Sequence, residues 1–532
     1  MEECGGVSVN GKDEQLIESV EEMAGKFSAE LMTHLPVWKT RLADAPQNLA
    51  DLERDVHVAF ARGADLIVAG LLAVVMKHPD FVSACTKTKE SFAYPLKRGR
   101  KRSVQIKLLG GLIMWVHSYY CEARQLGLWK TQPRNPGVYI PLLQFGIGRG
   151  VTPGLQSRVA RQAAVCQSFE LAQQELESSG LKLDVKMIRR ITTQCGEELL
   201  QLRKTWLQQW LAGTLVSGED LADGRVAVQI DGGRTRLRYD LEPVCHTPEQ
   251  LNKDGLKVED KPGRSKKKSK RTFSAEWREP KLMTIFVHNS EGRMVKQFTA
   301  TIDGTFQGPD AIAELVAMHL HRLGAAKAKS ITFVADGAPW IWDRIPVIVS
   351  KAKLQQVPTY EVLDNCHASH HVSLAMKEMG FDEAGRKSMY REHRTLLRNG
   401  QWRRVVDELK EFAEEVDPKS TVHTEIAYLE KHGEAGRLSY PHFRKLGLPL
   451  GSGAIESTIR RVVNLRLKSN AMFWREENAE AMMQVRAQVL TGQWDSRLEA
   501  TRELRRHDVR VDWRWTPQPM SEKHEDNLMT SG

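Results

Sequence analysis

Gly451-Ser-Gly-Ala-Ile-Glu456-Ser-Thr-Ile-Arg-Arg461 opens with two glycines and continues with apolar residues at helical spacing. Ser452 is suited to cap this helix, which places Glu456 in its first or second turn. A carboxylate at that position interacts favourably with the helix dipole. Taken alone, such a glutamate is an ordinary solvated residue at the start of a helix.

Two strand-like runs elsewhere end in an aspartate followed by glycine. Arg225-Val-Ala-Val-Gln-Ile-Asp231-Gly alternates as a strand does, and Ser330-Ile-Thr-Phe-Val-Ala-Asp336-Gly is a short apolar strand. An isolated Asp-Gly after a strand usually marks a turn. Two of them followed by a helix-borne glutamate are a rarer combination. It suits three carboxylates that converge on hard divalent cations, which prefer oxygen ligands.

At these residues the chain resembles the transposases of bacterial insertion sequences that use an Asp-Asp-Glu triad, particularly the ISKra-type group. The resemblance covers roughly Thr152 to Asp495. The matching motifs, in chain order, are Ile230-Asp231-Gly232, Ala335-Asp336-Gly337-Ala338, Leu448-Pro-Leu-Gly-Ser-Gly-Ala-Ile-Glu456, Arg466-Leu-Lys-Ser-Asn-Ala-Met-Phe-Trp474 and Leu490-Thr-Gly-Gln-Trp-Asp495. The resemblance implies an RNase H-like core in which Asp231, Asp336 and Glu456 are the catalytic residues and the metal ligands.

The composition is that of a basic protein from a reducing compartment. The 532 residues include 77 Lys and Arg against 67 Asp and Glu, and the formal charge of +10 favours a polyanionic partner. The seven cysteines are scattered without a Cys-x-x-Cys pair, which predicts free thiols. The longest uncharged apolar run, Leu66 to Met76, is too short to span a bilayer. We therefore expect a soluble cytoplasmic protein, associated with the bacterial nucleoid and not with a membrane.

The chain is too long for one domain, and we divide it into four regions. They are a mainly helical N-terminal region (1–150) with a β-hairpin around Gly110-Gly111, a helix-turn-helix-like DNA-binding domain (151–222), a catalytic core (223–495) and a basic C-terminal tail (496–532). Met1 to Asp13 has the composition of a frayed end. The run Lys97-Arg-Gly-Arg-Lys-Arg102 either contacts phosphates or forms a solvated loop.

The DNA-binding assignment rests on three short helical patterns, of which the last, Asp184 to Gly196, has a basic outer face. Lys186, Arg189 and Arg190 lie on that face, as they would on a recognition helix that enters the major groove. The family resemblance supports this placement. The alternative is an ordinary three-helix packing unit with a polar surface.

Two further basic segments are candidates for DNA contact. Asn252 to Arg271 includes Lys266, Lys267 and Lys268, and its charge predicts a solvated loop. This loop either binds the DNA phosphate backbone or makes no contact with DNA. Arg460 and Arg461 lie about one helical turn after Glu456 and make its neighbourhood very basic, so they are also candidates for DNA contact. Contacts of this kind add affinity but carry no sequence information.

The order of elements in the core predicts an α/β fold, an RNase H-like mixed sheet with a helical insertion, preceded by a mainly helical DNA-binding region. A hairpin, Leu282–His288 and Met294–Ile302, follows the first strand, and a strand at Tyr360–Leu363 follows the second aspartate. The charged helical segment at about 383–437 is the insertion. It must fold back, because the chemistry requires Glu456 near Asp231.

A Cys/His cluster and two tryptophans have alternative interpretations. Cys366, His367, His370 and His371 suggest zinc, but packing or polar contact near the active site is the better assignment for His367. Relatives often carry zinc-binding cysteines after the N-terminal hairpin, whereas Cys121 has no suitably spaced partner here. Trp340 and Trp342, just past Asp336, either stack on an unpaired base or belong to the core.

The resemblance implies a two-metal mechanism. Two Mg²⁺ ions about 4 Å apart, for which Mn²⁺ can substitute, would stabilise the attacking and leaving oxygens. Asp231 would bridge both ions, and Asp336 and Glu456 would each complete one site. A freed 3′-hydroxyl would then attack target DNA. The expected partners are double-stranded DNA, as terminal repeats and as target, and further copies of the chain assembled on DNA. No small-molecule cofactor is expected.

Two other functions remain open at this stage. An RNase H-like nuclease would cleave DNA without joining 3′ ends to a target. A non-catalytic DNA-binding protein derived from a transposase would retain the three acids only as turn and cap residues. The presence of all three acids together with their flanking glycines argues against the second alternative.

Overall fold

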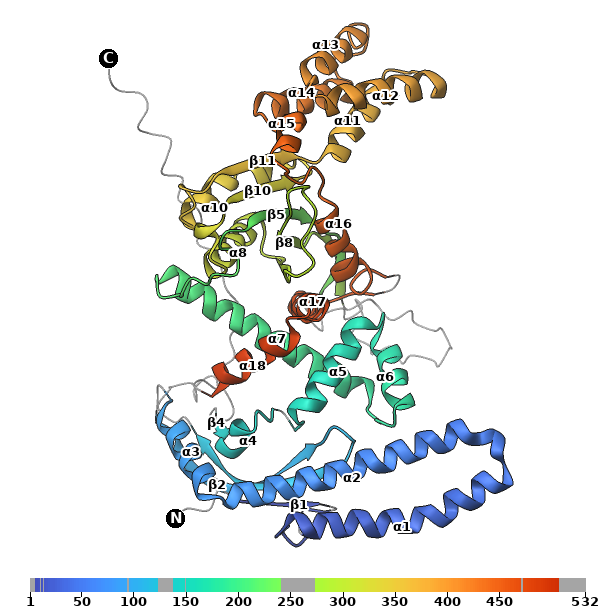
Figure 1. Ribbon diagram of the computed structural model, residues 1–532, viewed down its shortest axis with the longest axis vertical. Coiled ribbons are helices and arrows are strands. Elements are labelled where there is room, and N and C mark those ends of the chain that lie inside the picture. Colours follow the sequence, from blue (N-terminus) through green and yellow to red (C-terminus); the bar gives the residue numbers. More distant parts are fainter. Residues whose placement is uncertain are drawn as a thin grey trace, which may run out of the picture.

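The computed structural model describes residues 5–9, 11–12, 14–92, 95–122, 137–148, 150–240, 273–469 and 472–506. The protein is mixed α/β, as the sequence predicted. Figure 1 shows an elongated arrangement with a long helical hairpin, α1 (Val20–Asp44) and α2 (Leu49–Lys77), at one end. A mixed sheet lies near the centre, and a small helical bundle lies at the opposite end.

The central sheet has five strands in the order β11-β10-β5-β8-β9. β5 pairs in parallel with β10, which pairs in parallel with β11, whereas β8 is antiparallel to both β5 and β9. The strands are β5 (Arg225–Gly232), β8 (Lys281–Val287), β9 (Thr301–Thr305), β10 (Ser330–Ala335) and β11 (Thr359–Leu363). The two strands that were predicted to end in Asp-Gly are therefore direct neighbours.

The predicted hairpin after β5 is only partly formed. Its turn, Asn289–Gly292, exists and is closed by the Asn289 side chain, which accepts hydrogen bonds from the backbone N–H groups of Glu291 and Arg293, each at 2.9 Å. Beyond an isolated pair between His288 and Met294, the returning chain leaves the sheet. Strand β9 then begins only at Thr301.

Both faces of the sheet are covered because successive strand residues point to opposite sides. Met283 and Ile285 on β8 belong to a core formed with α8 (Pro309–Arg322) and α10 (Ile345–Lys351). Leu282, on the opposite face, belongs to a second core that includes α16 (Gly453–Ile459) and α17 (Glu476–Leu490). The sheet is thus buried on two sides, which explains its nearly continuous apolar strands.

Five helices separate β11 from α16. They are α11 (Asn365–Glu378), α12 (Glu383–Arg398), α13 (Trp402–Phe412), α14 (Thr421–Glu434) and α15 (Tyr440–Lys445). On the apolar face of α13, Trp402, Val405, Val406 and Leu409 are buried, but Phe412 is 42% exposed. The chain does return to the sheet, because the Tyr440 hydroxyl donates to the Leu363 carbonyl at 3.0 Å.

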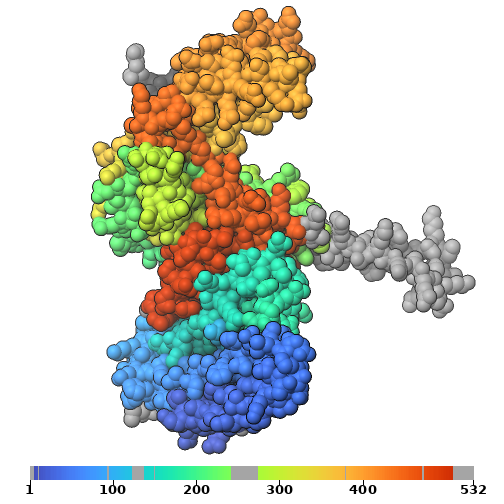
Figure 2. Space-filling model, turned by 45° about the vertical axis from the view of Figure 1, so that its right-hand side comes forward, coloured from blue at the N-terminus to red at the C-terminus, as the bar shows by residue number. Residues whose placement is uncertain are grey.

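The three helices predicted before the core are present as α5 (Pro153–Val165), α6 (Phe169–Ser178) and α7 (Val185–Leu211). Asp184 caps α7 by accepting a hydrogen bond from the Met187 N–H at 2.7 Å. The helix runs without a break past Gly196, where a Cβ would lie 2.4 Å from the Ala481 carbonyl oxygen. This glycine therefore permits close contact between α7 and α17. In Figure 2 the segment containing α5–α7, in teal, lies directly against the C-terminal helices, in red.

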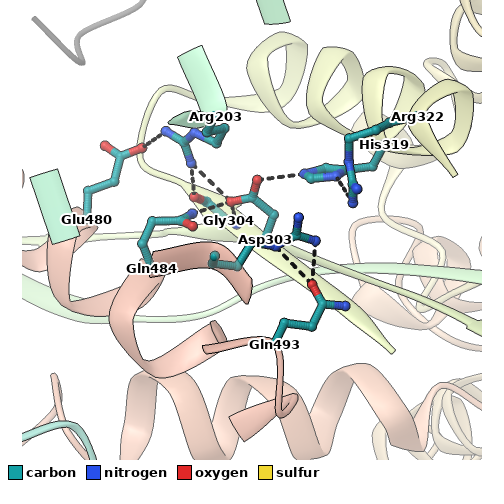
Figure 3. Close-up of polar contacts among 9 residues, drawn as sticks. Arg203, Asp303, Gly304, His319, Arg322, Glu480, Gln484 and Gln493 are labelled. Carbon is teal, nitrogen blue, oxygen red and sulfur yellow. Dashed lines mark hydrogen bonds and ion pairs between the residues drawn. The ribbon is translucent and has the colours of Figure 1, made fainter. Parts of the chain in front are cut away.

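A buried charged network joins α7 to the sheet (Figure 3). Arg203 on α7 donates to Asp303 on β9 at 3.0 Å and to Glu480 on α17 at 2.7 Å. His319 on α8 lies 2.9 Å from the other oxygen of Asp303, and Gln484 also donates to this carboxylate. Because the partners come from four elements, the helical region 153–211 and the core share one interior within the described residues.

The N-terminal region differs from the sequence prediction in two places. Gly6–Val9, assigned to a frayed end, forms the buried strand β1 and pairs with β3 (Ile113–Glu122). The basic run Lys97–Arg102 is the first half of strand β2 (Lys97–Lys107), so the solvated-loop alternative is wrong, whereas contact with phosphates stays a prediction. The hairpin β2–β3 is present as predicted, and Asp65 on α2 holds its turn by accepting from the N–H groups of Gly110 and Leu112. The region is completed by α3 (Pro79–Glu90), β4 (Gly137–Tyr139) and α4 (Ile140–Gln144).

Within the described ranges one helical stretch, Pro46–Lys77, is long and apolar enough to cross a membrane by length and composition. It is longer than the apolar run recognised in the sequence. Core helices of soluble proteins pass the same test, so one such stretch is weak support for a membrane protein. Leu66, Ala69 and Met76 are buried in the N-terminal core, whereas Val68, Leu71 and Val74 are exposed, and 33% of the apolar window is buried.

The segment assigned to the C-terminal tail begins as a helix, α18 (Trp494–Arg505). Trp494 and Leu498 are buried against α5 and α7, and Arg505 forms an ion pair with Glu198 at 3.1 Å. The helical part of this segment thus belongs to the fold, whereas the predicted tail beyond residue 506 lies outside the described residues.

A two-stranded sheet of β6 (Thr235–Asp240) and β7 (Phe273–Arg278) extends from β5.

Candidate active site

The first two predicted acids lie at the same edge of the central sheet. Asp231 is near the end of β5, and Asp336 directly follows β10. Ser330–Val334 pair in parallel with Arg225–Gln229, so continuation of this register places Asp336 beside Asp231. Carboxyl ends of adjacent parallel strands are the usual position of sites in α/β sheets.

The pKa of Asp231 shows that the two carboxylates interact. Burial and, next, the neighbouring Asp336 raise the pKa of Asp231 to about 6. Two neighbours lower this pKa. They are the Gly232 N–H, which donates to Asp231 Oδ1 at 2.6 Å, and the nearby His367. Two carboxylates that share a half-buried site repel each other, and a divalent cation relieves this repulsion.

Glu456 approaches the same region from the first turn of α16. Its Oε1 lies 3.7 Å from His367 Nε2 and 3.4 Å from the Ser452 hydroxyl. The side chain is 54% exposed. His367 also lowers the pKa of Asp231, so its imidazole lies near both Glu456 and Asp231.

Two buried residues that the sequence analysis missed fix the position of α16. Gln229 on β5 donates to the Gly451 carbonyl at 2.9 Å and accepts from the Ile455 N–H at 3.0 Å. Asp364, at the end of β11, accepts hydrogen bonds from both the N–H and the hydroxyl of Ser452 at 2.5 Å. Ser452 therefore binds Asp364 and does not cap α16 with its side chain, contrary to the sequence prediction.

The sequence contains only weak indications that Gln229 and Asp364 have a structural role at the site. Gln229 is the one polar side chain between apolar neighbours in the run Val226 to Ile230. Asp364 is a third aspartate directly after a strand, like Asp231 and Asp336. It is buried and serves as the N-cap of α11, so its role is to connect β11, α11 and α16.

The helical insertion contacts the site through Tyr428 on α14. Its hydroxyl donates to the Asp336 backbone carbonyl at 2.6 Å. Gly337 has φ of +94°, and a Cβ there would lie 2.1 Å from this hydroxyl, so glycine is required for the approach. His371 stacks on the Tyr428 ring with centroids 3.7 Å apart and also binds Glu425. His367 and His371 thus face different carboxylates.

The two tryptophans differ in their surroundings. Trp342 is 4% exposed, and the Arg437 guanidinium lies 4.3 Å from the centre of its ring, so it belongs to the core. A stacking role for Trp342 is wrong on this ground. Trp340 is half-buried, and the Lys281 ammonium lies 4.4 Å from the centre of its ring.

The predicted DNA-contacting residues fall into three groups. Lys186, Arg189 and Arg190 are exposed on α7. Arg460 and Arg461 are exposed at the end of α16, on the chain segment that carries Glu456. Lys266, Lys267 and Lys268 lie outside the described residues.

The donor set partly fits magnesium. Asp231 and Asp336 supply oxygen ligands at one edge of the sheet, and their mutual repulsion favours a cation there. In the part of the chain that the structure describes, no three His, Cys, Asp or Glu side chains lie close enough to hold one metal ion together. Glu456 faces His367 and Ser452 in this arrangement.

Comparison with known protein families, with curated proteins and with solved structures finds no match to this chain. Any functional assignment therefore depends on the chain's own residues and their geometry.

Proposed function

We propose that this protein is a metal-dependent DNA transposase with an RNase H-like catalytic core. One observation carries the proposal: adjacent parallel strands β5 and β10 end in Asp231 and Asp336, while Gln229 holds the helix of Glu456 against β5. On one side of β5 lie β8, which is antiparallel to β5, and β9, which is antiparallel to β8. On the other side lie β10 and β11, which run parallel to β5. This order supports an RNase H-like fold. The helical insertion between Asp336 and Glu456 agrees with the family resemblance.

Asp231 and Asp336 are the residues that would hold Mg²⁺, with Glu456 as the third ligand. Bound Mg²⁺ supplies charge compensation at phosphorus and lowers the pKa of a bound water. His367 positions Glu456, because it contacts this carboxylate from the first turn of α11. Gln229 and Asp364 prevent α16 from moving away from the sheet, which keeps the third acid at the same edge.

The proposed substrate is double-stranded DNA, first at the ends of the element and then at the target. The exposed Arg460 and Arg461 follow the Glu456 helix, where they contact phosphates next to the site of cleavage. Lys186, Arg189 and Arg190 on α7 contact DNA further along the duplex. The protein acts as a homo-oligomer on DNA in the bacterial nucleoid, because both ends of an element must be held together.

Metal removal is the first test. The purified chain is incubated with an end-labelled duplex that carries the terminal sequence of its own element, in Mg²⁺ or in EDTA. We expect nicking at the edge of the terminal sequence in Mg²⁺ and none in EDTA, because two-metal chemistry needs the cation. Mn²⁺ should restore cleavage after EDTA is removed. Joining of the freed 3′ end to a second duplex, read on a denaturing gel, identifies a transposase.

The other outcomes of this test separate the alternative functions. Mg²⁺-dependent nicking without any joined product would identify an RNase H-like nuclease. Binding to the duplex with no cleavage in either metal would identify a DNA-binding protein that lacks catalysis. Cleavage that persists in EDTA would contradict the metal-dependent site altogether.

The affinity for Mg²⁺ should fall at low pH. Asp231 must lose its proton to bind a cation, and its pKa is raised to about 6. The affinity should therefore drop by about tenfold between pH 7 and pH 5, measured by isothermal titration calorimetry. His367→Gln removes the neighbouring imidazole as a titrating group, and the Mg²⁺ affinity of this variant should still fall between pH 7 and pH 5. A constant affinity over this range would contradict the role of Asp231.

A further inference from the structure

A groove of about 490 Å³ lies beside the core, at the junction of four chain segments. It is lined by the start of α6, by α7, by β6, by Arg466 and by residues 472–478 at the start of α17. Its size falls within the range of about 300–1,000 Å³ that is usual for ligand pockets. The groove plays no part in the proposed acidic triad.

The lining is rich in arginine. Arg189, Arg238, Arg466 and Arg475 contribute to it, and Glu170 is the one acidic residue among the described residues of the lining. Asp240 at the rim pairs with Arg238 at 2.8 Å and with Arg475 at 2.5 Å. Positive charge remains in excess inside the groove, which favours an anionic ligand.

Arg466 is the most informative of these residues because it is 2% exposed. Its Nε donates to the Ala163 carbonyl at 3.2 Å, but its Nη2 has no acceptor within the described residues. The indole N–H of Trp474, a second lining residue, also lacks an acceptor there. Buried donors are nearly always paired, so a ligand that brings acceptor oxygens would complete this site.

Aromatic rings form the other part of the wall. Phe169 and Trp474 both lie under the Arg466 guanidinium, with ring centres 4.5 Å and 5.1 Å from its carbon. Phe473 is half-buried and lines the groove next to Met472. Arginine forks suit phosphate oxygens, and aromatic faces suit nucleobases.

We propose that this groove binds one unpaired nucleotide of a DNA strand, with its phosphate at the arginines and its base against Phe473. The identity of the strand as substrate DNA rests on the proposed function. Arg238 lies on the strand that follows Asp231, and Arg466 lies beyond the helix of Glu456. Both segments that carry these acids therefore continue into the groove, where an unpaired nucleotide would fix the DNA strand relative to them.

The test uses the full chain in EDTA, so that binding is measured without cleavage. The probe is a fluorescein-labelled thymidine pentanucleotide, followed by fluorescence anisotropy at 150 mM salt (about physiological). Phe473→Ala and Arg238→Ala should each weaken binding by at least about tenfold, because each removes a base or phosphate contact. The matched controls Phe412→Ala, on an exposed ring of α13, and Arg158→Ala, on the exposed surface of α5, should bind as wild type does.

Three results would overturn the inference. The first is no binding of the probe by the wild-type chain. The second is equal binding by Phe473→Ala and wild type. The third is equal competition by a blunt-ended duplex long enough to stay paired, which would assign the arginines to ordinary backbone contact. Failure of the proposed function looks different: the probe binds in a Phe473-dependent manner, but the terminal duplex is never nicked in Mg²⁺.

Discussion

Asp231→Ala is expected to lower Mg²⁺-dependent strand cleavage by at least about 10³-fold, since loss of a metal ligand removes several kcal/mol of charge stabilisation. The residue sits near the end of the central strand, where burial and, next, the neighbouring Asp336 raise its pKa. DNA binding should be unchanged, because the basic surfaces lie on other elements. Single-turnover cleavage of the labelled terminal duplex, with a gel-shift titration beside it, measures both quantities.

Asp336→Ala and Glu456→Ala should behave in the same way as Asp231→Ala. Asp343→Ala is the matched control, because this aspartate is exposed and lies just beyond the site on the same segment as Asp336. Wild-type cleavage by Asp231→Ala or Asp336→Ala would contradict the proposed site. Wild-type cleavage by Glu456→Ala alone would reduce the site to the two strand-end acids and leave Glu456 as a partner of His367.

The sequence predicted those parts of the core whose signals are local. A buried strand that ends in Asp-Gly can be recognised within eight or nine residues, and both β5 and β10 were placed correctly. The pairing of β5 with β10 did not follow from that pattern, because residues about a hundred positions apart carry no local signal of contact. That the two acids lie together was inferred from the metal chemistry that three carboxylates suit and from the resemblance to a known family.

The residues that hold Glu456 in place were missed for the same reason. Gln229 bonds to Gly451 and Ile455, and Asp364 bonds to Ser452, across separations of 222, 226 and 88 positions. Sequence periodicity does not report hydrogen bonds over such distances. Ser452 was assigned as a helix cap from its local position, whereas its hydroxyl donates to Asp364 and accepts no hydrogen bond from the N–H groups at the start of α16.

Two strands in the N-terminal region, Gly6–Val9 and the Lys97–Arg102 run, were also not predicted from the sequence. Gly6–Val9 has the alternating valines of a short strand but was grouped with the polar residues around it, whereas the Lys97–Arg102 run does not have the composition of a strand; both pair with β3. Strand formation here is decided by the partner that is present, and the apolar β3 supplies it. Local propensity is a weak guide where a neighbouring strand fixes the backbone.

Asp303→Asn is expected to destabilise the core by about 3–5 kcal/mol, because it removes one charge from a buried pair. Asp303 and Arg203 are both almost fully buried and lie 3.0 Å apart. Burial alone would raise the pKa of Asp303, but Arg203, His319 and the Gly304 N–H together hold it below its usual value. The carboxylate is therefore ionised in the folded protein, and its replacement leaves Arg203 with Glu480 as its one remaining charged partner in the described network (Figure 3).

Urea unfolding followed by circular dichroism gives the free-energy difference, and Asp495→Asn provides the contrast. Asp495 is 82% exposed and pairs with Arg161 at 3.6 Å, so its loss should cost less than about 1 kcal/mol. An equal, small effect of both substitutions would show that the Arg203–Asp303 pair does not join α7 to the sheet. A large effect of Asp303→Asn alone, with loss of helical and sheet signal in a single transition, would show that α7 and the central sheet unfold as one unit. In that case the DNA contact that we propose for α7 would be rigidly connected to the strands that carry Asp231 and Asp336.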